Sequence, residues 1–131
     1  MKKATLLCLF LLFAPGLMAA TGVDYFHSDW ERAKKVAAKE EKPLYVHFTT
    51  EWCGWCRRIE NDVYKSKEGK KALERFVPVS LDCTRRNKDG KELREAMENQ
   101  QLMKIWGGSG SPFLVQGTAD GGMLNSWRGY R

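Results

Sequence analysis

The chain has 131 residues and a formal net charge of +6, and 43% of its residues are hydrophobic. This length allows one ordinary domain and excludes a two-domain enzyme with a cleft between its lobes. Aromatic residues make up 11% of the chain, which can build a core and therefore excludes a disordered protein. The four cysteines are compatible with two disulfides, one metal site or a catalytic group.

The first twenty residues have the pattern of a secretory signal. A short basic start is followed by an apolar run over residues 4–13 and by small residues that end at Ala20. The run is shorter than the roughly 20 apolar residues that span a bilayer. Bulky Met18, close to the expected cleavage site, leaves an uncleaved anchor as the alternative. We expect a signal peptide over 1–20 and a periplasmic or secreted domain over 21–131, with no stable membrane insertion after cleavage.

Cleavage changes both the charge and the cysteine count. The net charge falls from +6 to +4, because Lys2 and Lys3 leave with the signal. The remaining basic runs alternate with Glu, as on solvated helix faces, so the sequence does not support nucleic-acid binding. Cys8 is also removed, and the three cysteines that remain leave a framework of structural disulfides incomplete.

Helices and strands alternate along the domain. Ser28 is expected to be the N-cap of a capping box that opens a helix ending before Pro43. The core face of this helix is expected to carry Trp30, Ala33, Val36 and Ala37. The apolar run 44–49 predicts a buried strand, and a helix over 53–64 follows it.

The second half continues the alternation. Ser66 is expected to cap a short helix, and residues 77–82 form a second strand. A helix then begins at Asp89 and turns Leu93, Met97 and Leu102 toward a core. A strand over 112–115 pairs through a Gly121-Gly122 turn with a strand over 123–127. This order predicts an α/β domain with one parallel pair and a mixed sheet of about four strands.

The segment 51–56 (EWCGWC) joins the first strand to its helix and carries the chemistry. Unpaired backbone N–H groups and the positive dipole end of a helix N-terminus favour a thiolate there. Cysteines in C-x-x-C motifs accordingly have pKa values lowered from about 8.5 to roughly 3.5–7.5. We expect Cys53 to be the exposed nucleophile that attacks a disulfide and Cys56, one turn inside the helix, to resolve the mixed disulfide.

Residues 43–58 (PLYVHFTTEWCGWCRR) resemble the active-site stretch of the thioredoxin family, and Ser111-Pro112-Phe113 resembles its cis-proline loop. The nearest group is that of exported thioredoxin-like proteins, which includes the C-terminal domain of periplasmic DsbD. The resemblance implies a three-layer thioredoxin-like fold and a protein-disulfide oxidoreductase with no cofactor besides its Cys53–Cys56 disulfide. Its partners are then protein thiols and disulfides, together with a membrane electron donor.

The resemblance also implies a substrate surface. It consists of the residues around the thiols and of the cis-proline loop, where the backbone of Ser111 pairs with an extended substrate segment: Trp52, Gly54, Trp55, Ser111 and Pro112. Trp55 replaces the proline of thioredoxin, which leaves the direction of electron flow open. Because the Trp-Cys-Gly-x-Cys string is closer to thioredoxin than to periplasmic oxidases, we expect a reductase.

Two further residues each have two interpretations. His47 stands where thioredoxins have a buried aspartate, so it is either the proton acceptor for Cys56 or a histidine of the core. Cys83 ends the second parallel strand at the same sheet edge as Cys53, so it is either a third redox thiol or a small buried hydrophobic residue. The latter is favoured, because free cysteine is among the most buried residue types.

Three expectations complete the sequence analysis. The family's last helix is missing after Gly129-Tyr130, so one flank of the sheet is bare or is covered by residues 29–42 or by a partner. A metal-binding module built from Cys53, Cys56, Cys83 and a histidine is an alternative, although the second close ligand pair of structural zinc sites is lacking. A non-catalytic adaptor that docks partners by its tryptophans is the other alternative.

Overall fold

The computed structural model describes residues 23–129. The elements follow one another as α1 (Trp30–Glu40), β1 (Leu44–Thr49), α2 (Gly54–Ile59), a π-helical turn η1 (Glu60–Tyr64), α3 (Lys67–Leu73), β2 (Val77–Asp82), α4 (Gly90–Ile105), β3 (Phe113–Gly117) and β4 (Met123–Arg128). Within the described part of the chain, none of the helices is long and apolar enough to cross a membrane.

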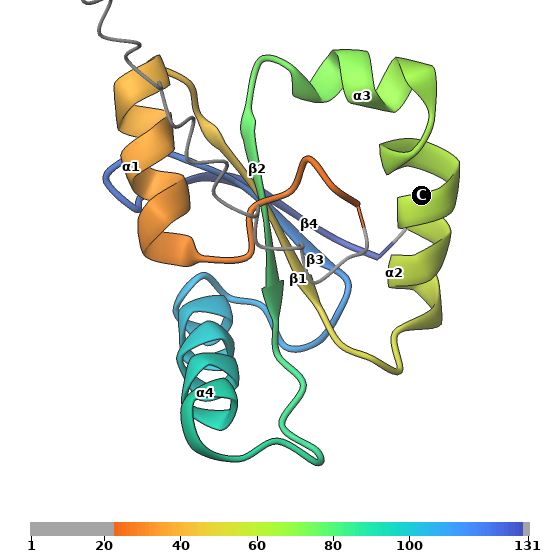
Figure 1. The fold of residues 1–131 in the computed structure, drawn as a ribbon, viewed down its shortest axis with the longest axis vertical. Coiled ribbons are helices and arrows are strands. Elements are labelled where there is room, and N and C mark those ends of the chain that lie inside the picture. The colour runs from red at the N-terminus through yellow and green to blue at the C-terminus, as the bar shows by residue number, and fades with distance from the viewer. Residues whose placement is uncertain (1–22, 130–131) are drawn as a thin grey trace, which may run out of the picture.

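One mixed sheet with the strand order β2-β1-β3-β4 forms the middle layer of the fold. The central strand β1 runs parallel to β2 and antiparallel to β3, and β4 pairs antiparallel with β3. α1 and α4 lie on one side of the sheet, and α2 and α3 lie on the other (Figure 1). The predicted three-layer α/β fold with a mixed four-stranded sheet is confirmed.

Successive side chains of β1 point to opposite faces of the sheet and pack in two separate hydrophobic cores. Val46 and Phe48 pack with residues of α1, α4 and the neighbouring strands. Tyr45 packs on the other side, in a cluster with Tyr64 of η1 and Phe26 of the N-terminal segment. Since residues paired across a sheet share a face, His47, which lies opposite Ser80 and Leu114, points toward the side of α2.

Two helix starts differ in detail from the sequence prediction. The N-cap of α1 is Asp29 rather than Ser28, and its carboxylate accepts a hydrogen bond from the backbone N–H of Arg32 at 2.8 Å. Ser28 lies one residue too early to reach that N–H. Asp89 is the N-cap of α4 as predicted, but its side chain makes no capping hydrogen bond.

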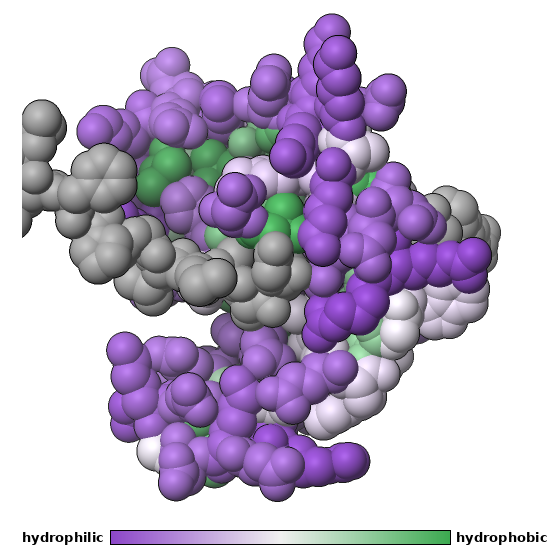
Figure 2. Space-filling model, turned by 45° about the vertical axis from the view of Figure 1, so that its right-hand side comes forward, coloured by the Kyte–Doolittle hydropathy of each residue, from purple (hydrophilic) through white to green (hydrophobic). Residues whose placement is uncertain are grey.

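The predicted core face of α4 is partly wrong. Met97 is 47% exposed, whereas Ala96 and Met103 are buried and Leu102 is partly buried. The cause is the small number of apolar residues on this helix. Its surface, at the bottom of Figure 2, is mostly hydrophilic. With so few apolar positions, the helical period alone did not fix which side faces the sheet.

Within the described part of the chain, no helix covers the flank of the sheet beside β4. No helix follows β4 within residues 23–129, and α1 cannot cover this flank because it packs on the opposite side of the sheet. A groove of about 460 Å³ runs here, lined by apolar side chains that include Tyr45, Ile59, Leu114 and Trp127. The outer edge of β2 is covered instead, because His27 forms a parallel bridge with Val79.

Candidate active site

Cys53 and Cys56 form a disulfide where β1 gives way to α2. Cys53 is the N-cap of α2, and its Sγ accepts a hydrogen bond from the backbone N–H of Cys56 at 3.1 Å. The same N–H and the helix dipole stabilise a thiolate on Cys53 when the disulfide opens. Cys53 is only 7% exposed, less than the sequence suggested, but Cys56 is wholly buried. Of the two sulfurs, that of Cys53 is therefore the one that a substrate can reach.

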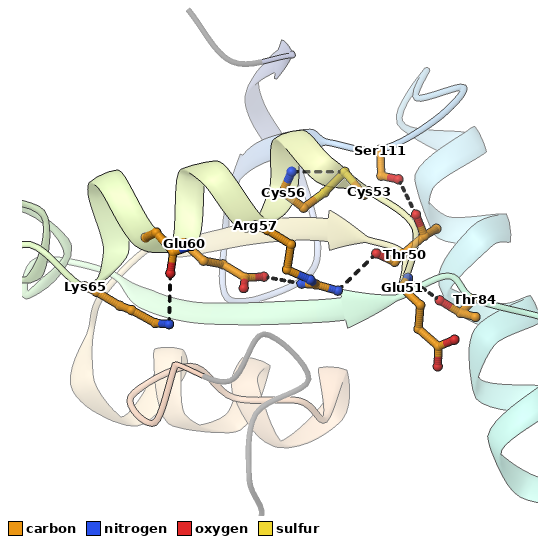
Figure 3. Close-up of polar contacts among 10 residues, drawn as sticks. Thr50, Glu51, Cys53, Cys56, Arg57, Glu60, Lys65, Thr84 and Ser111 are labelled. Carbon is orange, nitrogen blue, oxygen red and sulfur yellow. Dashed lines mark hydrogen bonds and ion pairs between the residues drawn. A yellow bond between two sulfur atoms is a disulfide. The ribbon is translucent and has the colours of Figure 1, made fainter.

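The Ser111–Pro112 loop lies beside this pair. Its peptide bond is cis, as the family resemblance implied. A hydrogen bond of 2.9 Å between the hydroxyls of Thr50 and Ser111 joins the loop to the segment that carries Cys53 (Figure 3). The structure thus brings together two segments that lie about sixty residues apart in the sequence.

Trp52, Gly54 and Trp55, which the resemblance assigns to the substrate surface, flank Cys53 in the sequence. The two indoles are 57% and 54% exposed. A Cβ atom added to Gly54 would meet no other atom within 4 Å, so the space above this residue is open. The surface beside the disulfide therefore combines two exposed aromatic rings with open space at Gly54.

An ion pair below the disulfide, between buried Glu60 and partly exposed Arg57, was not predicted from the sequence. The carboxylate of Glu60 lies 2.7 Å from the guanidinium of Arg57, which also donates a hydrogen bond to the carbonyl of Thr50 at 3.2 Å (Figure 3). Burial raises the pKa of Glu60, and the charge of Arg57 opposes this shift. The sequence signal for this pair is the spacing of three residues between Arg57 and Glu60, which places opposite charges on one side of a helix.

His47 is completely buried, and neither ring nitrogen has a hydrogen-bond partner among the described residues. Its ring packs against the edge of Tyr64, with the ring centroids 5.5 Å apart. Burial, and secondly the charge of Arg57, lower the pKa of His47 from 6.5 to about 3. The histidine is therefore neutral at physiological pH and could take a proton from a neighbouring thiol only against this preference.

Cys83 is buried against α4 and the sheet. Its Sγ donates a weak hydrogen bond to the carbonyl of Leu81 at 3.8 Å. Burial, and secondly the neighbouring Asp82, raise the pKa of Cys83 to about 12. The thiol is thus protonated at neutral pH, and it is shielded from reagents.

We expect Cys83 to resist alkylation in the native protein, because the thiolate is the reactive form and the sulfur is buried. The measurement is iodoacetamide labelling of the reduced protein at about pH 8, with the Cys83 peptide quantified by mass spectrometry. Cys53 in the same sample is the internal control and should be labelled rapidly. Labelling of Cys83 at the rate seen in denaturant would contradict the expectation and would favour a third redox thiol.

The geometry gives no support to a metal centre built from these cysteines. Among residues 23–129, no group of three or more His, Cys, Asp or Glu side chains is placed to hold a metal ion. Cys53 and Cys56 are bonded to each other, and Cys83 lies in the core on the other side of the sheet from His47.

Comparisons with known proteins agree with this site. A model of the Thioredoxin-like family matches residues 25–115. No curated protein matches the chain in sequence. The DsbH oxidoreductase has a similar structure, with 24% identity and a TM-score of 0.64 over 90% of this chain and 80% of its own.

Two further structures are similar to this one. The reduced C-terminal domain of DsbD from Neisseria meningitidis is 25% identical, with a TM-score of 0.59 over 77% of this chain and 82% of its own. A thioredoxin from Thermus thermophilus is 20% identical, with a TM-score of 0.62 over 82% of this chain and 78% of its own. With the family model covering most of the chain and a Cys-x-x-Cys disulfide at the N-terminus of α2, the chain belongs to the Thioredoxin-like family, as a thioredoxin-fold disulfide oxidoreductase.

Proposed function

We propose that this protein is an exported reductase of disulfides in other proteins. The observation that carries the proposal is the Cys53–Cys56 disulfide at a helix N-terminus, with the Ser111–Pro112 loop held beside it. The backbone of Ser111 and the rings of Trp52 and Trp55 hold an extended substrate segment. Gly54 keeps the approach to the sulfur open.

The reaction proceeds in two exchange steps. The Cys53 thiolate attacks one sulfur of the substrate disulfide, which forms a mixed disulfide and releases the second substrate sulfur as a thiolate. The Cys56 thiol then loses its proton and attacks Sγ of Cys53. The Cys53–Cys56 disulfide forms, and the substrate sulfur that was bonded to Cys53 leaves as a thiolate. Two electrons pass from the protein to the substrate, whose two thiolates take up protons.

The second step needs a group that accepts the proton of buried Cys56. His47 of the central strand β1 is one candidate, although its lowered pKa makes it a weak base. Glu60 is the other, since its buried carboxylate lies on the same helix side as Cys56 and has a raised pKa. A membrane electron donor would return two electrons to the Cys53–Cys56 disulfide after each turnover.

The export part of the proposal rests on the sequence pattern of residues 1–20, which lie outside the described residues. It places the domain in the periplasm or outside the cell, where protein disulfides persist. The N-terminal sequence of protein recovered from that compartment is expected to begin at Thr21. Protein that retains Met1 would contradict cleavage and favour an uncleaved anchor.

The reduction potential of the Cys53–Cys56 pair tests the direction of electron flow. Thioredoxin has a potential of about −270 mV and the oxidase DsbA about −120 mV. We expect a value below about −200 mV in a glutathione redox buffer, because the Trp-Cys-Gly-x-Cys string resembles that of thioredoxin. A value near that of the oxidase would overturn the reductase assignment and leave an oxidase or isomerase.

A further inference from the structure

An arginine side chain lies over the ring of each of the two tryptophans beside the disulfide. The guanidinium carbon of Arg86 lies 4.9 Å from the ring centroid of Trp52, and that of Arg58 lies 5.5 Å from the ring centroid of Trp55. The two arginines come from different elements, Arg58 from α2 and Arg86 from the loop after β2. Stacking on an indole leaves the N–H edge of a guanidinium directed outward, where it can bind a carboxylate.

Two arginines of the loop after β2, Arg85 and Arg86, have no ion-pair partner among the described residues, whereas Lys88 of the same loop is paired with Asp82. None of the salt bridges between residues 23 and 129 involves Arg85 or Arg86. Arg57 is already paired with buried Glu60 at 2.7 Å, whereas Arg58 has only a long, exposed contact of 3.7 Å with Asp62. Among the described residues, Arg85 and Arg86 therefore have no carboxylate partner, and Arg58 has only this solvent-exposed one.

A groove on α4 continues this basic surface. It has a volume of about 670 Å³ and begins at Arg85, next to the arginine that covers Trp52. Arg94 and Lys104 line its sides together with a single carboxylate, Glu98, and the exposed side chain of Met97 adds apolar surface. Basic side chains beside apolar surface fit an acidic peptide segment.

We propose that the protein selects substrate segments in which the reactive cysteine is flanked by Asp or Glu. The proposal rests on the reductase function proposed above and names its substrate class. The carboxylates on the two sides of the cysteine bind Arg58 and Arg86, while the chain itself lies over Trp52 and Trp55. A segment with Lys or Arg at these positions is repelled.

Short peptides closed by one internal disulfide test this specificity. Three peptides differ only in the residues that flank one cysteine, which are two Glu, two Gln or two Lys. Stopped-flow measurement gives the second-order rate constant for their reduction by the pre-reduced protein. We expect the Glu peptide to react about tenfold faster than the Lys peptide at about 0.02 M salt, and the difference to nearly vanish at about 0.5 M.

Four variants test whether Arg58 and Arg86 cause the difference between the peptides. Arg86→Gln and Arg58→Gln should each reduce the ratio of the Glu to the Lys rate by about threefold, whereas Arg86→Lys keeps the charge and most of the ratio. Lys35→Gln makes the same charge change on exposed α1, on the far side of the sheet, and should leave the ratio unchanged. The ratio cancels any effect of an arginine on the reactivity of Cys53, because both peptides meet the same thiolate.

Two results would overturn the specificity proposal. One is a ratio near one for the unaltered protein at low salt, and the other is a ratio that Arg86→Gln and Arg58→Gln do not change. Failure of the reductase function itself would look different, because the Gln peptide would then not be reduced at all.

Discussion

Cys56→Ser is expected to stop turnover and to trap the protein on its substrate. Serine cannot attack the mixed disulfide, so the substrate stays bonded to Sγ of Cys53. The reduced variant, mixed with a protein disulfide, should give a covalent adduct on a non-reducing gel that dithiothreitol releases. Reduction of insulin by dithiothreitol should fall to the rate without protein.

Cys53→Ser is the matched control, since it makes the same atomic change three residues earlier. This variant should also lose insulin reduction, but it should form no adduct, because the sulfur of Cys56 is wholly buried. Circular dichroism shows whether both variants keep the fold. Equal adduct formation by the two variants would overturn the assignment of Cys53 as nucleophile.

Acidification is expected to destabilise the protein through His47. The unfolded chain binds a proton on this residue below about pH 6.5, whereas the folded protein binds it only near pH 3. Between these values the unfolded state holds more protons, so the stability contributed by neutral His47 is complete above pH 6.5 and falls as the pH decreases. From about pH 7.5 to about pH 4.5 the loss amounts to about 2 to 3 kcal/mol, since one pKa unit corresponds to about 1.4 kcal/mol.

His47→Phe separates this effect from the titration of carboxylates. Phenylalanine keeps an aromatic ring against Tyr64, and no hydrogen bond is lost, because neither nitrogen of His47 has a partner among the described residues. Urea unfolding at the two pH values should therefore show that the free energy of unfolding falls by about 2 to 3 kcal/mol less in the variant than in the unaltered protein. Parallel pH profiles would show that His47 is protonated in the folded protein or is not buried in solution.

The two parallel strands, β1 and β2, were predictable because apolar and β-branched residues are concentrated in both. Residues 44–49 are apolar except for His47 and Thr49 and follow Pro43, residues 77–82 are rich in Val and Leu, and both strands have the predicted bounds. Helix α4 was less predictable, because too few apolar residues mark its buried side. The helix predicted over 53–64 was correct in extent, but its change to a π-helical turn at Glu60 depends on packing that the sequence does not express.

The residues of the candidate site were likewise predictable only in part. Cys53, Cys56 and Pro112 were found because their spacing and family resemblance are local features of the sequence. The Thr50–Ser111 hydrogen bond and the Arg57–Glu60 pair were not found. A charged residue such as Glu60 is ordinarily interpreted as solvated, since Glu is rarely buried unless it is paired. Only the three-dimensional structure shows that Arg57 provides that pairing.

The short span of the disulfide decides what it can contribute to stability. Only three positions separate Cys53 from Cys56, and closing so small a ring removes about 2 kcal/mol of chain entropy from the unfolded state, against about 4.7 kcal/mol for a loop of about 100 residues. The two hydrophobic cores are formed by residues between Val23 and Val115, and neither core includes Cys53 or Cys56. The domain can therefore alternate between its oxidised and reduced forms in every catalytic cycle while the same folded scaffold persists.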